Sequence, residues 1–357
     1  MMEAEAASDG IRLFAVGDSA SPTPRHVRKW AETRPVEGLE IEIEQGTDLH
    51  EALDRLSNHS VDLIAVSARL WNDAVEVSDT IVATALPRRE ENHILVASDR
   101  PAFLPHKSII LAPNRLQRRQ LRRYRADFRV MDPRAFADAV GLTHPEGDAL
   151  VIAEWLEELR GTGTITGYVS ERHLFSAAAI DARRHTLMTD PREGETVRFL
   201  PSPLHGLTLL IARPGFPPSL AERIGDAESA TAWSCEQILL QGVSQSIHDR
   251  VGMIVRHRQI GSLLKQAEVE RDLLRSTSLL NAEGDIVDPA TLVEVLLEAV
   301  GRTGERTLLL ERLVRMVDAS TAVRLMLNDW DTMLDAVTAE HEEDIRLGPQ
   351  RPAFLDL

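Results

Sequence analysis

This sequence of 357 residues is poor in several residue types, and each shortage excludes a class of protein. A single cysteine, Cys235, cannot build an internal disulfide framework or a thiolate zinc cluster. Aromatic residues make up only 4% of the chain. No stretch approaches the ~20 consecutive apolar residues that a membrane-spanning helix needs. The acidic start lacks the basic and apolar regions of a signal peptide, so a cytoplasmic location is expected.

The charge balance is acidic, and it restricts the partners of the protein. The formal net charge is -16, while 43% of the residues are hydrophobic, as in ordinary soluble globular proteins. Affinity for duplex nucleic acid comes largely from neutralising phosphates, which an acidic protein does poorly. Nucleic acid is therefore not expected as a partner. A membrane is not expected either, because no apolar stretch is long enough to span one.

The first third of the chain alternates between patterns typical of strands and helices. Short apolar or alternating runs favour strands, whereas apolar positions three or four apart favour helices. The predicted strands cover residues 11–16, 39–44, 63–66 and 80–86, and the predicted helices cover residues 24–33 and 49–59. This order is typical of an α/β unit built on a parallel sheet.

A second unit of the same kind follows. Its predicted strands are residues 93–96, 108–111, 128–131 and 149–153, with a helix over 114–125, and two further strands are predicted at 196–200 and 207–212. Two α/β lobes with the chain crossing between them would bind a ligand in the cleft at the carboxyl ends of their strands.

The remainder predicts a smaller domain and a helical end. A helix is predicted at residues 290–301, and two amphipathic helices beyond residue 304, the second through Val323, Met326 and Trp330. The expected domains are a flexible tail (1–9), a first lobe (10–90 with 196–216), a second lobe (91–195), a small α+β domain (217–303) and a helical extension with a tail (304–357).

Four segments carry a resemblance to a known family. They are residues 51–67, which end in VDLIAVS, residues 85–96, residues 108–125, which contain RRQLRR, and residues 147–153. In their order and spacing these segments resemble the hydroxymethylbilane synthase family, also called porphobilinogen deaminase. The resemblance implies two lobes like those of type II periplasmic binding proteins, followed by a small α+β domain and here by a C-terminal helical extension.

The same resemblance implies the loss of the family's chemistry. The family condenses porphobilinogen onto a dipyrromethane primer that is attached to a loop cysteine, and a cleft aspartate assists. The aspartate position falls on Leu70 and the cysteine position on Ile247. Cys235, inside a helical pattern, is better interpreted as a buried structural residue. No catalytic residue is assigned, no cofactor is expected, and whether the protein is an enzyme stays open.

A positive stripe is the clearest candidate site. Arg115, Arg118, Arg119 and Arg122 recur at helical spacing, and Arg134 matches a family arginine. Guanidinium groups pair well with carboxylates, so the stripe is interpreted either as a site for polycarboxylated pyrroles or porphyrins or as a solvated face. The histidines lack paired metal-ligand spacing, and no metal site is predicted.

The functional hypothesis is a divergent hydroxymethylbilane synthase-like protein of tetrapyrrole biosynthesis. It would be unable to run the primer-dependent condensation and would bind a pyrrole or porphyrin carboxylate. The alternative is a non-catalytic scaffold or regulator acting through its C-terminal helices, which would contact a protein partner or a second copy. True synthase activity with a rearranged site is the least favoured alternative.

Overall fold

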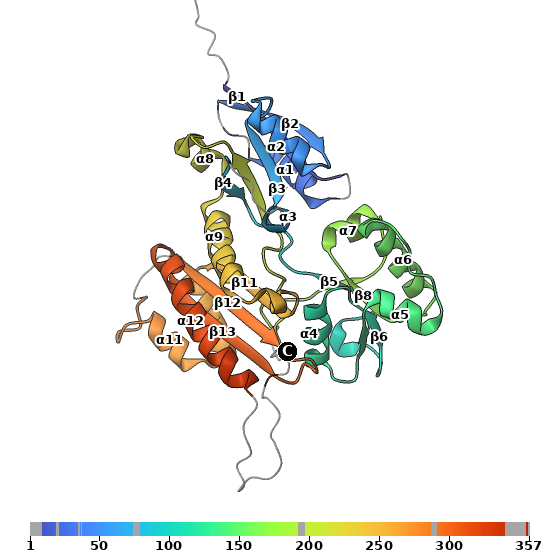
Figure 1. Cartoon of the computed structure of the whole chain (residues 1–357). Coiled ribbons are helices and arrows are strands. Elements are labelled where there is room, and N and C mark those ends of the chain that lie inside the picture. Colours follow the sequence, from blue (N-terminus) through green and yellow to red (C-terminus); the bar gives the residue numbers. More distant parts are fainter. Residues whose placement is uncertain are drawn as a thin grey trace, which may run out of the picture.

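A computed structural model describes residues 9–18, 21–34, 36, 38–73, 79–191, 197–286, 291–339 and 355. It contains three sheets, and Figure 1 shows them as three separate bodies. The first lobe is mostly blue with α8 in olive, the second lobe is green, and the third body runs from yellow α9 to red α12. Across the described part of the chain, none of the helices combines the length and the apolar character that crossing a bilayer requires.

The first lobe is a five-stranded sheet in the order β2-β1-β3-β10-β4. Its strands are β1 (Asp9–Val16), β2 (Leu39–Gly46), β3 (Leu63–Ser67), β4 (Ile81–Leu86) and β10 (Thr208–Ala212). β1 runs parallel to β2 and β3, whereas β10 is antiparallel to β3 and β4. The predicted strands and helices of this lobe are confirmed, and β10 enters the sheet from a distant part of the chain.

Helices cover both faces of the first sheet. α1 (Pro22–Thr33) buries Val27 and Trp30 on one face, and α2 (Leu49–Ser57) buries Ala52 and Leu56 on the other. The short α3 (Ala68–Asp73) and α8 (Pro218–Ile224) complete the lobe. Because α1 and α2 have one apolar face each, they take the places that their sequence periodicity predicts.

The second lobe repeats this plan in the order β7-β6-β8-β5-β9. Its strands are β5 (Ile94–Ala97), β6 (Ile109–Leu111), β7 (Arg129–Met131), β8 (Gly167–Ser170) and β9 (Arg184–Thr186). β6 is parallel to β7 and β8, and β5 is antiparallel to β8 and β9. Its helices are α4 (Arg115–Tyr124), α5 (Pro133–Val140), α6 (Ala149–Gly161) and α7 (Arg172–Ala177).

Two predicted strands of this region are wrong. Residues 149–153 begin α6, where the Asp148 carboxylate caps the helix by accepting from the Leu150 and Val151 N–H groups. A short apolar run does not distinguish a buried helix from a strand. Here the Asp148 cap favours the helix. The described residues 197–200 of the other prediction form no strand.

The third body is an antiparallel sheet of β11 (Val251–Arg258), β12 (Leu292–Val300) and β13 (Thr307–Arg315). α9 (Ala227–Gly242) and α12 (Ala319–Thr338) contact each other and the sheet. α10 (Ile260–Glu270) and α11 (Leu273–Leu279) follow β11. The confirmed fold class is therefore two α/β lobes, a small α+β body and a C-terminal helix.

Two helices predicted in this part are strands instead. Residues 292–300 form β12, which is buried on both faces because α9 and α12 cover one side while α4 and Leu200 contact the other. A strand buried on both faces shows no alternation, so its apolar pattern resembles that of a helix. The first of the two C-terminal helices is β13, and the second is α12, with Val323, Met326 and Trp330 buried as predicted. The exact domain boundaries stay a prediction.

The chain crosses between the lobes twice, and a buried ion pair holds the two crossing segments together. Residues 87–93 lead from β4 to β5, and residues 187–207 lead from β9 back to β10. The Arg88 guanidinium donates to the His205 carbonyl at 2.9 and 2.7 Å and to the Glu236 carboxylate at 2.5 Å. Since Glu236 belongs to α9, Arg88 connects both crossing segments to the third body.

Candidate ligand-binding cleft

A cavity of about 500 Å³ lies between the two lobes. Its walls follow the carboxyl ends of parallel strands: residues 16–18 at the end of β1, Ser67, Arg69 and Leu70 at the end of β3, and residues 171–174 after β8. The two crossing segments add Arg89 and Glu90 from one side and residues 204–208 from the other. Ligand sites of open α/β sheets form at this edge, as the sequence predicted for the interlobe cleft.

Cations outnumber carboxylates in the cavity wall, although the protein as a whole is acidic. The wall has five cationic side chains against three carboxylates: Arg25, Lys29, Arg69, Arg89 and Arg172 against Asp18, Glu90 and Glu171. Among the described residues, none forms an ion pair with Arg25, Lys29, Arg69 or Arg89. An excess of positive charge in a concave site attracts an anion.

The amino end of α1 also borders this cavity. The Asp18 carboxylate accepts from the Ser21 N–H at 2.7 Å and from its hydroxyl at 2.8 Å, which shapes the loop before the helix. Gly17 has φ +144°, and a Cβ there would lie 2.6 Å from the Ser21 Cβ, so glycine is required. The first turn of α1 contains no acidic residue that would neutralise the positive end of the helix dipole.

His26 of α1 presents a buried nitrogen without a partner. Only 7% of the residue is exposed, and its Nδ1 shares a hydrogen bond of 3.0 Å with the Thr208 hydroxyl. Its Nε2 has no hydrogen-bond partner among the described residues. Burial, followed by the positive charge of Arg89, lowers the pKa of His26 to about 4. The imidazole is therefore neutral at neutral pH, and it can offer one N–H donor.

Two further histidines and a glutamate meet at the junction of the two crossing segments. His93 stands directly before β5, His205 lies three residues before the start of β10, and Glu171 stands directly after β8. Their potential ligating atoms all lie within 4.8 Å of one another. The two imidazole rings stack with centroids 4.3 Å apart and 20° between their planes.

Burial keeps this cluster weakly charged. It lowers the pKa of His93 to about 4, with smaller contributions from Arg69 and His173, and it lowers the pKa of His205 well below the usual value. Burial also raises the pKa of Glu171, although Arg69 opposes that shift. His173 Nδ1 lies 3.3 Å from a Glu171 carboxylate oxygen. Both stacked imidazoles therefore hold free electron pairs at neutral pH.

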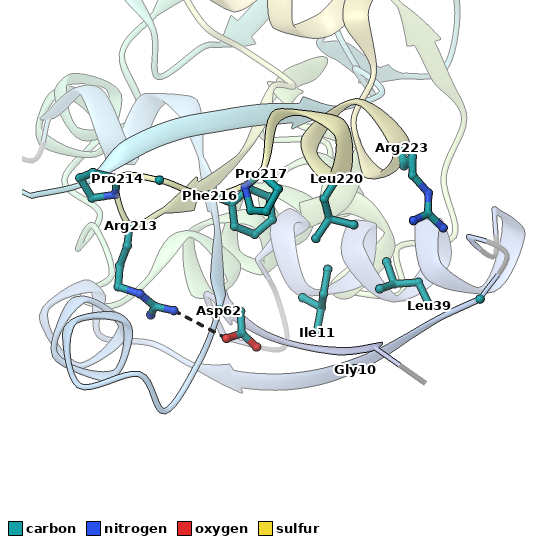
Figure 2. Close-up of a pocket in the computed structure, with 12 residues that line it drawn as sticks. Gly10, Ile11, Leu39, Asp62, Arg213, Pro214, Phe216, Pro217, Leu220 and Arg223 are labelled. Carbon is teal, nitrogen blue, oxygen red and sulfur yellow. Dashed lines mark ion pairs between the residues drawn. The ribbon is translucent and has the colours of Figure 1, made fainter. Parts of the chain in front are cut away.

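A second cavity of about 400 Å³ lies at the opposite edge of the first sheet. Figure 2 shows Arg213 reaching toward Asp62, with 3.7 Å between guanidinium and carboxylate, and Arg223 at the other end of the cavity. The Arg213 guanidinium also donates to the Leu56 and Val61 carbonyls. Because this guanidinium already holds the lobe together, the interlobe cavity is the stronger candidate site.

The predicted arginine stripe lies on α4, and none of its members lines the interlobe cavity. Arg115 and Arg119 face the third body instead. Arg115 forms a 2.9 Å ion pair with Asp249, and the buried Arg119 donates to the Val300 carbonyl at 2.6 Å. These two guanidinium groups therefore connect the second lobe to the third body.

The other predicted arginines contact the second lobe itself. Arg118 pairs with Asp132 at 2.9 Å, and Arg122 donates to the Val130 carbonyl at 2.8 Å and also to the Arg302 carbonyl of the third body at 3.3 Å. Arg134 lies on α5, with an exposed side chain. A role for the five arginines in binding carboxylates stays a prediction, whereas the cations of the cavity wall were not predicted.

The two positions aligned with family chemistry lie in different places. Leu70 lines the interlobe cavity with 42% of its surface exposed, whereas Ile247 is buried in the core of the third body. Cys235 is fully buried in the same core, as its helical context predicted. Burial, followed by the charge of Glu236, raises the pKa of its thiol to about 11.

Comparison with known proteins gives a distant likeness only. No model of a protein family matches the chain, and no curated protein matches it. Similar solved structures include a zinc-bound ligand-binding component of an ABC-type import system from Staphylococcus aureus, with 12% identity, 65% of this chain and 73% of that chain covered, and a TM-score of 0.30. A putative methionine-binding lipoprotein from Bacillus subtilis has 11% identity, coverage of 61% and 91%, and a TM-score of 0.31. The reduced regulatory domain of OxyR2 from Vibrio vulnificus has 12% identity, coverage of 63% and 98%, and a TM-score of 0.30.

These comparisons correct the predicted family. The similar structures are substrate-binding and regulatory domains, not hydroxymethylbilane synthases, and neither the family models nor the curated proteins supply a match. The predicted membership in that family and the predicted place in tetrapyrrole biosynthesis were wrong. The four matching segments follow the strands and helices of a two-lobed α/β fold, and such a pattern of elements does not identify a function.

Proposed function

We propose that this protein is a non-catalytic binding protein whose interlobe cleft holds a small anionic molecule, such as a dicarboxylate or a phosphate ester. The unpaired cations of the cavity wall carry this proposal. In contrast with the arginines of α4, which have protein partners, Arg25, Lys29 and Arg89 have no ion-pair partner among the described residues. An anion bound here would gain charge-assisted hydrogen bonds without breaking existing ones.

The size and construction of the cavity support the same proposal. A volume of about 500 Å³ falls within the ~300–1,000 Å³ typical of small-molecule sites. The wall also provides the unpartnered His26 Nε2, which as an N–H donor suits an oxyanion. Donors for the ligand therefore come from imidazole, guanidinium and ammonium groups together.

Both lobes contribute to this wall, which suggests a regulatory use of binding. Lys29 belongs to the first lobe and Arg172 to the second. A ligand that contacts both would favour the arrangement in which the lobes are close, because only that arrangement supplies all its donors. Glu236 of the third body contacts both crossing segments, through Arg88 and the Leu204 N–H, so the third body is placed to respond to lobe closure.

Thermal shift and calorimetry with a panel of mono-, di- and tricarboxylates, phosphate esters and matched neutral compounds would test the proposal. We expect anions to bind and neutral analogues to fail. Arg89→Gln should weaken anion binding by about 10- to 100-fold, the value of one charge-assisted hydrogen bond. Arg324→Gln on the exposed surface of α12 makes the same charge change and should leave binding unaltered. Equal affinity of wild type and Arg89→Gln for every anion would contradict the proposed site.

A second candidate function is protein association through the C-terminal part of the chain. Val317 is 85% exposed before α12, and Leu325 within α12 is 60% exposed. Large apolar side chains that stay exposed are candidates for a contact with a partner. Sedimentation velocity of the wild type and of the variant with Val317→Ser and Leu325→Ser would test self-association. A monomer at all concentrations for both proteins would argue against a dimer on this face.

A further inference from the structure

The junction of the crossing segments brings together three potential metal ligands that are far apart in the sequence. His93 lies on the first crossing segment, His205 on the second, and Glu171 at the end of β8. His205 and Glu171 line the interlobe cavity, and His93 lies behind them with only 9% of its surface exposed. No pair of these residues shows the spacing of a metal motif, so the cluster arises from the fold.

Strand direction explains the meeting of His93 and Glu171. β5 is antiparallel to β8, and Ile94 pairs with Ser170. The residue before Ile94 is therefore opposite the residue after Ser170, which places His93 next to Glu171. β10 begins at the corresponding edge of the first lobe, where Thr208 pairs with Ser67. The Arg88 guanidinium then fixes the His205 backbone by donating to its carbonyl.

We propose that His93, Glu171 and His205 bind one divalent transition-metal ion of the zinc class. Two imidazoles and one carboxylate form a donor set that suits such ions, and three protein ligands leave a position open. Ligand atoms bound ~2.1 Å from one ion lie at most about 4.2 Å apart. The present atoms lie within 4.8 Å of one another, so an inward shift of less than about 1 Å assembles the site.

Two features of the cluster determine how it would bind the ion. The near-parallel stacking of His93 and His205 requires at least one ring to turn before both lone pairs meet on one ion. His173 Nδ1, 3.3 Å from the Glu171 carboxylate, can orient that carboxylate by a hydrogen bond. The open position would face the cavity, because Glu171 and His205 belong to its wall.

Positive side chains near the cluster oppose the binding of a cation, and negative ones favour it. Arg69 acts on all three groups, and Arg88 acts on His205. Glu171 and the nearby Glu90 supply the negative charge that balances them. The site would therefore be closer to neutral than a carboxylate-rich one, which favours imidazole-binding ions over Ca²⁺ or Mg²⁺.

Cobalt titration of the full chain tests the site directly. The protein is freed of metal with a chelator, Co²⁺ is added without any anionic ligand, and visible absorption is recorded; Zn²⁺ is then measured by competition with a chromophoric chelator. We expect one equivalent of Co²⁺ with an absorption typical of four- or five-coordinate ions, and its displacement by Zn²⁺. His93→Ala and His205→Ala should each weaken binding by at least about 100-fold, above the loss that outer partners produce.

Matched variants make the result decisive. His50→Ala, an exposed histidine on α2, should bind metal like the wild type. Glu171→Gln has nearly the same shape as the native side chain, and it decides the question where a histidine variant fails to fold. The proposal is overturned by the absence of stoichiometric Co²⁺ binding, or by equal affinity in wild type and Glu171→Gln. Because no anion is present, this result is separate from the test of anion binding.

Discussion

Removal of the Glu236 carboxylate is expected to loosen the connection between the third body and both crossing segments. Glu236 is fully buried and accepts four hydrogen bonds: two from the Arg88 guanidinium at 2.5 and 3.4 Å, and one each from the Leu204 and Val255 N–H groups at 2.9 Å. The Arg88 side chain is only 9% exposed. Glu236→Ala thus leaves a buried guanidinium and two buried N–H groups without their acceptor.

The expected cost is large for a single substitution. Removing one partner of a buried ion pair costs about 3–5 kcal/mol of the free energy of unfolding, because the remaining charge stays desolvated. The exposed pair between Arg312 and Asp329, 2.6 Å apart with side chains 43% and 52% exposed, provides the comparison. Asp329→Ala should cost no more than about 1 kcal/mol.

Urea unfolding followed by circular dichroism measures both costs. In the double variant Arg88→Met with Glu236→Leu, neither charge remains buried, so stability should recover relative to Glu236→Ala. The reasoning is refuted if Glu236→Ala costs as little as Asp329→Ala, or if the double variant is no more stable than Glu236→Ala.

Three further predictions concern single residues. Because the pKa of His26 in the folded protein is about 4, below its ordinary value near 6.5, only the unfolded chain binds the extra proton between these pH values. This residue therefore lowers the free energy of unfolding by about 3 kcal/mol in total as pH falls from 6.5 to 4. His26→Gln should flatten this part of the pH profile of stability, measured by urea unfolding. An unchanged slope between pH 6.5 and 4 would contradict the assignment. The Cys235 thiol, with its pKa near 11 and no exposed surface, should react with a thiol reagent only after denaturation, and fast labelling of the native protein would argue against its burial. Gly206→Ala should cost about 2 kcal/mol or more, since φ is +76° and the new Cβ would lie 2.3 Å from the Arg89 carbonyl oxygen; a neutral effect on thermal unfolding would show that this contact can relax.

Hydrophobic periodicity predicted well those helices and strands that have one buried face and one exposed face. The alternation of residues 39–44 and the helical spacing of Val27 and Trp30 record which side of each element faces the core. The same reasoning failed for β12, because a strand covered on both faces has no polar side to mark its period. At residues 149–153 the capping residue Asp148 was the signal for a helix, whereas the apolar run had suggested a strand.

The candidate site could not be predicted to the same degree. The arginines of α4 stood out in the sequence by their number, yet packing against the third body and the second lobe gave four of them protein partners. The cations of the cavity wall are scattered along the chain and show no common spacing. Arg69 and Arg89 follow the predicted strands 63–66 and 80–86, and this position was a signal that could have found these two.

The sequence by itself indicated the elements of the first lobe and the presence of two α/β lobes, because hydrophobic periodicity acts between neighbouring residues. Tertiary structure decided which strands run antiparallel, and thereby brought His93, Glu171 and His205 together from three distant segments. It also decided which charges are neutralised, since an ion pair depends on the distance between side chains in space and not on their separation along the chain.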